Sequence, residues 1–116
     1  MVNDYRELEV WQMSMSLCEK AYALMRSFPA DERFALCDQL RRAVVSIPSN
    51  IAEGNGRDSK NEYARFLSIA RGSLFEVQTQ LELAERLKYI TVPEETKTLI
   101  TRISTMLFSM VRKLRV

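Results

Sequence analysis

An apolar stripe with helical spacing runs straight through a proline, and this conflict constrains the fold more than any other feature. Four apolar side chains recur at steps of four, three and four residues, the spacing of a buried helical face. They are Leu40, Val44, Ile47 and Ile51, and Pro48 lies among them. A proline inside a helix costs about 3 kcal/mol, because it lacks an N–H and its ring clashes with the carbonyl four residues earlier. We therefore predict a helix kinked at Pro48 and a Val44 carbonyl that needs another hydrogen-bond donor.

The same spacing predicts helices over most of the chain. We expect them at about residues 8–26, 31–54, 59–88 and 91–114. No stretch alternates as a strand would, and the connections between the helices are short. The sequence therefore predicts a single all-α domain, residues 1–116, folded as an antiparallel up-down-up-down four-helix bundle.

Particular residues are expected at the helix ends. Ser59 and Glu62 have the spacing of a capping box, in which each satisfies a free N–H of the other. Gly54 is expected to end its helix in the left-handed conformation, and Thr91 is expected to cap the last helix. These residues set the predicted boundaries.

Several apolar residues lie outside the expected buried faces of the helices. The stripe of helix 8–26 is predicted to be Leu8, Trp11, Met15, Cys18, Tyr22 and Met25, and Phe34 and Cys37 extend the stripe of helix 31–54. Apolar residues outside the predicted stripes are Val10, Leu17, Leu67, Phe75 and Phe108. A wide core would account for them, and so would a partner subunit, because large exposed apolar patches are rare. We favour oligomerisation.

Composition excludes several classes of protein. The 116 residues are 47% hydrophobic and 28% charged, as in an ordinary globular chain. The longest uncharged run, 43–52, is too short to span a membrane, and the first residues lack a signal pattern, so we expect a cytoplasmic protein with no membrane partner. Cys18 and Cys37 are too few for a disulfide framework and are expected to be free thiols.

The chain offers little catalytic chemistry. It contains no histidine, which excludes Ser-His-Asp and Cys-His catalysis and the histidine ligands of zinc and di-iron sites. No phosphate-binding loop or dinucleotide fingerprint is present. We expect no catalytic residue, no cofactor and no metal. Glu53 and Glu76 could act as acid–base groups, but we expect them to pair with Arg42 or Arg71 instead.

Polar residues cluster on two of the predicted helices. The set consists of Gln39, Arg42, Ser46, Pro48, Asn50, Glu53, Arg71, Gly72, Ser73 and Glu76. One interpretation is a structural seam, within the chain or between subunits, that satisfies the backbone broken by proline and fixes helix register. The other is a ligand or partner pocket. Gly72 would let another backbone approach closely.

Basic residues gather toward the end of the sequence. Residues 96–116 carry five basic groups and no acidic one, although the whole chain is only +2. The candidate nucleic-acid contacts are Arg41, Arg102, Arg112, Lys113 and Arg115. Arginines and hydroxyls on one helix face can contact phosphates without reading sequence. The alternative is a solvated face whose last cations suit the negative end of the helix dipole.

Several segments resemble one family. They are residues 8–12, 28–29, 39–54, 66–76 and 87–90. This pattern resembles the small bacterial four-helix-bundle proteins first noticed inside intervening sequences of large-subunit ribosomal RNA genes. The resemblance implies a ring-shaped homopentamer. It also extends to the accessory variability determinant proteins of diversity-generating retroelements, which are basic rings that bind nucleic acid and a reverse transcriptase, although a net charge of +2 fits that branch poorly.

Two positions depart from the family pattern. Residues 34–36 read Phe-Ala-Leu where many relatives have Tyr-Gly-Leu, and Lys88 stands where they often have glycine. We expect both changes to be conservative for the fold.

Three functions fit these observations. The first is a non-enzymatic oligomeric scaffold that binds RNA or DNA weakly through basic helix faces. The second is a protein–protein adaptor that binds an unidentified protein and no nucleic acid. The third is a carrier of a small ligand in the polar segment 46–53.

Overall fold

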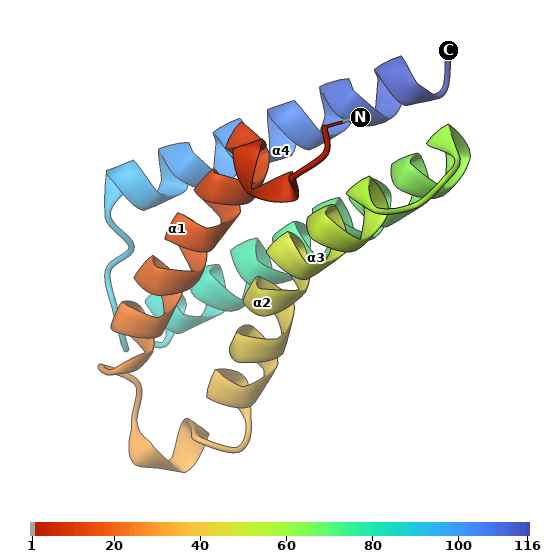
Figure 1. Ribbon diagram of the computed structural model, residues 1–116. Coiled ribbons are helices and arrows are strands. Elements are labelled where there is room, and N and C mark those ends of the chain that lie inside the picture. Colours follow the sequence, from red (N-terminus) through yellow and green to blue (C-terminus); the bar gives the residue numbers. More distant parts are fainter. Residues whose placement is uncertain (1) are drawn as a thin grey trace.

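Four antiparallel helices form the molecule. The computed structural model describes residues 2–116, and no strand occurs among them. The helices are α1 (Glu9–Met25), α2 (Leu36–Asn55), α3 (Lys60–Arg86) and α4 (Glu94–Leu114), with short 3-10 turns at Tyr5–Glu7 and Ala30–Glu32. Each helix packs against the one before and after it, and α4 returns to α1 (Figure 1). The predicted all-α, up-down-up-down four-helix bundle is confirmed.

The core follows most of the predicted stripe on α2. On α2 the side chains from Cys37 to Ile51 in the stripe are buried, and so is Pro48. Phe34 is the exception, because it is 85% exposed. The prediction that α2 starts near residue 31 was wrong: residues 30–32 form a separate 3-10 turn, and the helix begins only at Leu36.

The buried face of α1 differs from the predicted one. Met15 and Tyr22 were expected inside, but they are 40% and 44% exposed. The side chains that face the core are Val10, Met13, Ser14, Leu17, Ala21 and Met25. Ser14 is satisfied there because its hydroxyl donates to the Val10 carbonyl at 2.7 Å. Apolar residues occupy two adjacent stripes of α1, and spacing alone cannot say which stripe faces inward.

Two predicted helix ends need correction. Gly54 does not adopt a left-handed conformation, since no glycine among residues 2–116 has a positive φ. It lies inside α2, where an added Cβ would come 2.8 Å from the Phe66 Cβ of α3. Glycine is therefore needed for close helix packing rather than for a turn. Thr91 does not cap α4, which begins after Pro93 without a side-chain cap.

One of the two hydrogen bonds of the predicted capping box forms at the start of α3. The Glu62 N–H donates to Ser59 Oγ at 3.0 Å, as predicted. The Glu62 carboxylate does not reach back to the cap, because it pairs with Arg65 at 3.0 Å. One predicted cap bond is thus present in this structure.

The end of α3 contains a left-handed residue that is not glycine. Lys88 has a φ of 64°. The Tyr89 N–H donates to the Ala84 carbonyl at 2.9 Å and the Lys88 N–H to the Glu85 carbonyl at 3.0 Å, the two bonds of a Schellman motif. A side chain in this conformation is strained, so lysine at this position is not a neutral replacement for glycine.

Candidate functional site

The α2 helix continues through Pro48. The Val44 carbonyl, which the proline leaves without its backbone donor, accepts a hydrogen bond from α1. The Cys18 thiol of α1 donates to the Val44 carbonyl, with 3.2 Å between Sγ and O. Burial raises the pKa of Cys18 to about 11, and neighbouring Glu19 adds to the rise. The thiol therefore keeps its proton at neutral pH and remains a donor. The prediction that the Val44 carbonyl needs another hydrogen-bond donor is confirmed, and the kink at Pro48 stays a prediction.

A polar seam joins α2 to α3 beside the proline. We define it as Ser46, Asn50 and Ser73. The Ser46 and Ser73 hydroxyls lie 2.8 Å apart, and the Asn50 amide donates to both the carbonyl and the hydroxyl of Ser46 at 2.8 and 2.9 Å. Ser73 is buried and the other two are half-buried. These residues satisfy one another's hydrogen-bonding groups between two packed helices. Such a network fixes the register of one helix against the other.

The charged residues expected in the seam lie elsewhere. Glu53 pairs with Arg57 at 2.8 Å and Arg42 with Asp38 at 3.2 Å, so the predicted pairing of Glu53 or Glu76 with Arg42 or Arg71 was wrong. The i,i+4 partners are simply closer than the opposite helix. Gln39, Glu76 and Gly72 are exposed. Nothing in the described chain comes within 4 Å of a Cβ built on Gly72, so no backbone of this chain uses the space it leaves.

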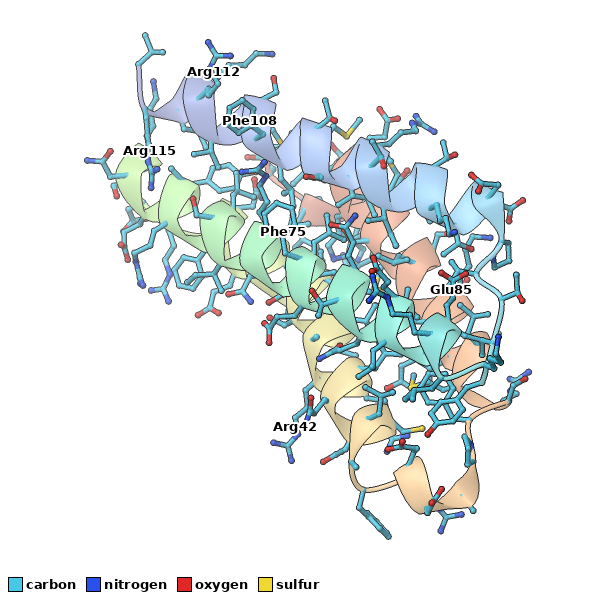
Figure 2. The ribbon with its side chains drawn as sticks, turned by 180° about the vertical axis from the view of Figure 1, so that it is seen from behind. Arg42, Phe75, Glu85, Phe108, Arg112 and Arg115 are labelled. Atoms are coloured by element: carbon cyan, nitrogen blue, oxygen red, sulfur yellow. The ribbon has the colours of Figure 1, made fainter. Side chains whose placement is uncertain are left out.

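Arg71 instead joins two exposed aromatic rings. Its guanidinium carbon lies 5.0 Å from the ring centre of Phe75 on α3 and 4.8 Å from that of Phe108 on α4. These three residues are called the Arg71 patch below; the two rings are 44% and 45% exposed. Figure 2 labels Phe75 on α3 and Phe108 on α4, where the two helices lie side by side. The Arg71 Nε is buried without a hydrogen-bond partner in this structure.

The basic residues of α4 end next to this patch. Arg112, Lys113 and Arg115 make no ion pair with any of residues 2–116, and the Arg112 guanidinium lies 5.7 Å from the Phe108 ring. Arg115 lines a hollow of about 290 Å³ together with Arg71, Phe75 and Phe108. The other two predicted contacts are engaged. Arg102 pairs with Glu9 of α1 at 3.4 Å, and Arg41 donates to the Arg33 carbonyl at 3.2 Å, at the far end of the bundle.

The described residues do not form a metal-binding cluster. No group of three or more Cys, Asp or Glu side chains in residues 2–116 is arranged to hold a metal ion. Both cysteines are free thiols. Across the same residues, every helix is too short or too polar to cross a bilayer.

A family model described as "23S rRNA-intervening sequence protein" matches residues 6–109. The chain belongs to this family. It is similar to the crystal structure of a protein of unknown function from the S23 ribosomal protein family of Bacteroides thetaiotaomicron VPI-5482, with a TM-score of 0.76 and 26% identity. The match covers 89% of this chain and 95% of that one. No curated protein sequence matches the chain.

In this intervening-sequence protein, two features of the site were missed from sequence. Cys18 was read as a buried apolar residue, and nothing in its spacing points to the Val44 carbonyl on another helix. The Arg71 patch did carry a signal, because Arg71 and Phe75, and likewise Phe108 and Arg112, are four residues apart and so share a helix face. The sequence could have indicated each pair but not the meeting of the two helices.

Proposed function

We propose that this intervening-sequence protein is a non-enzymatic scaffold that assembles as a homopentamer and binds RNA or DNA weakly. The observation that carries the proposal is the Arg71 patch, where two aromatic rings and a partly buried guanidinium are left uncovered beside three unpaired cations. The number of subunits is the one that the family resemblance implies.

The patch favours contact with a second copy of the chain. Large exposed apolar patches are uncommon on monomers, and aromatic residues are enriched at interfaces. A different apolar side chain, Met15 of α1, is also uncovered. Residues 1–32 carry six acidic and three basic groups, whereas the Arg71 patch is basic. Two unlike surfaces of opposite charge support head-to-tail contact, which closes into a ring when the rotation allows.

The free cations of α4 favour a polyanionic ligand. Arg112 and Lys113 lie in the last turn of α4 and Arg115 follows it directly. Figure 2 labels Arg112 and Arg115 at this end of the chain. A single set of three cations binds phosphates weakly at physiological salt. A ring repeats the set once per subunit, and simultaneous contacts raise the overall affinity. The chain then contacts phosphates without reading sequence.

A salt titration tests the binding proposal. Affinity of the wild-type protein for a fluorescent single-stranded RNA should fall steeply as salt rises. Changing Arg112, Lys113 and Arg115 together to glutamine should reduce both affinity and salt slope, whereas changing Arg86, which pairs with Glu82, should have little effect. No binding even at low salt would contradict nucleic-acid binding and leave the protein–protein adaptor as the better account.

Variants of the patch test self-association separately. Phe75→Ser combined with Phe108→Ser should release monomer in size-exclusion chromatography with light scattering. Phe34→Ser is the matched control, because Phe34 is also exposed but lies at the other end of the bundle. Unchanged mass in the double variant would show that the patch is not the interface.

A further inference from the structure

A hollow of about 460 Å³ opens at the end of the bundle opposite the last turn of α4. It lies where α1 ends, where the connection turns, and where α2 begins (Figure 1). The side chains that matter here are Tyr22, Arg26, Phe28, Arg33 and Arg41. This site is remote from the Arg71 patch, so it does not depend on the function proposed above.

Three arginines line the hollow without a matching set of carboxylates. Arg26 and Arg33 form no ion pair within the described part of the chain. Arg41 has only a distant one, to Asp38 at 3.9 Å. The second oxygen of Asp38 is engaged by Arg42 outside the hollow. No carboxylate lines the cavity itself, so three positive charges gather around it and an anion would relieve their repulsion.

The nearest glutamate is already used by the fold. Glu32 accepts a hydrogen bond from the Tyr89 hydroxyl at 2.7 Å and from the Leu36 N–H at 3.4 Å. These bonds tie the 30–32 turn to α2 and to the end of α3. The Glu32 carboxylate is held by these bonds and does not line the hollow, although its charge helps to raise the pKa of Cys37 there.

The rest of the lining is apolar and aromatic. Phe28 and Met25 are buried, and the Tyr22 ring is half-exposed at the edge. The Cys37 thiol also lines the cavity, and burial raises its pKa, against the opposing effect of Arg41, so it adds no negative charge at neutral pH. A ligand that fits must present an anion to the arginines and a planar or apolar group to the aromatic side.

We propose that this hollow binds a phosphorylated small molecule of nucleotide size. Guanidinium groups match the oxygen geometry of phosphate through paired N–H donors. Aromatic rings offer a stacking surface for a base. The volume falls within the range of small-molecule sites. Arg26 and Arg33 hold the phosphate, and Tyr22 contacts the planar part.

The test uses adenosine monophosphate and inorganic phosphate as probes. Calorimetry on the full chain at low salt should show adenosine monophosphate binding more tightly than phosphate. In ¹⁵N NMR spectra the amide shifts should concentrate around residues 22–41. Arg26→Gln and Arg33→Gln should each weaken binding about tenfold, since each removes a charge-assisted bond. Both side chains are exposed, so folding should be retained.

A control variant distinguishes binding at this hollow from general electrostatic attraction to the protein surface. Arg86→Gln removes the same charge from the exposed face of α3 and should leave the affinity within about twofold. Tyr22→Leu should weaken the binding of adenosine monophosphate but not the binding of phosphate. Equal binding of the two probes would overturn the aromatic part of the proposal. No binding of either, or equal loss in Arg86→Gln, would overturn the site itself.

Discussion

The bond from Cys18 to the Val44 carbonyl gives a prediction that isolates the effect of the proline. Cys18→Ala removes the side-chain donor that the structure records for this carbonyl. A buried carbonyl left without a partner costs about 1–3 kcal/mol, and a thiol is a weak donor, so the lower end applies. Loss of sulfur packing adds about 1 kcal/mol. Cys18→Ala should therefore destabilise the protein by about 2 kcal/mol.

The same change should cost less when the proline is absent. In Pro48→Ala, the new N–H at position 48 bonds the Val44 carbonyl, so the thiol is no longer needed. Cys18→Ala should then cost only the packing contribution. The double-mutant cycle should give a coupling of about 1 kcal/mol, measured by urea unfolding at one fixed protein concentration.

Cys37 provides the control for this cycle. It is a buried thiol three turns before Pro48 on the same helix, with no hydrogen bond recorded. Cys37→Ala should cost the same in both backgrounds, because distant sites are additive. An equal cost of Cys18→Ala with and without Pro48 would refute the reasoning.

Four further predictions concern single positions. Gly54→Ala should destabilise the fold by about 1–3 kcal/mol in urea unfolding, because its Cβ would lie 2.8 Å from the Phe66 Cβ. Gly72→Ala meets open space and should instead stabilise the chain slightly, unless a second copy packs there. Lys88→Gly should raise the stability by about 1 kcal/mol by relieving the left-handed strain at φ 64°, whereas Lys88→Ala should not. The pKa of Cys18 is raised from 9.0 to about 11, so its contribution to stability is complete below pH 9 and is lost as the pH rises toward 11; a comparison with Cys18→Ala over this range measures it.

Much of the architecture could be predicted from spacing, and the failures have clear causes. The α2 stripe was correct from Cys37 to Ile51 because this helix has a single dominant apolar face. On α1 the prediction chose Met15 and Tyr22 over Val10 and Leu17, since two stripes compete and only the neighbouring helices decide. Of the extra apolar residues, Val10, Leu17 and Leu67 complete the core, while Phe75 and Phe108 remain exposed.

The candidate site was harder to predict because its contacts cross between helices. Ser46 and Asn50 could be placed on one face from their spacing, but their meeting with Ser73 depends on the register of α2 against α3. The ion pairs predicted for Glu53 and Arg42 do not form, because each side chain pairs with a residue four positions away in the sequence. The strain at Lys88 could not be predicted, because it depends on a positive φ angle that the sequence does not show.

Native mass spectrometry of the full chain tests most directly whether uncovered surfaces join identical subunits. A series of protein concentrations should show one dominant species at five times the chain mass of 13.5 kDa. The Phe75→Ser, Phe108→Ser double variant should move toward a single chain under the same conditions. A wild-type protein that stays at 13.5 kDa at every concentration would contradict the proposed assembly.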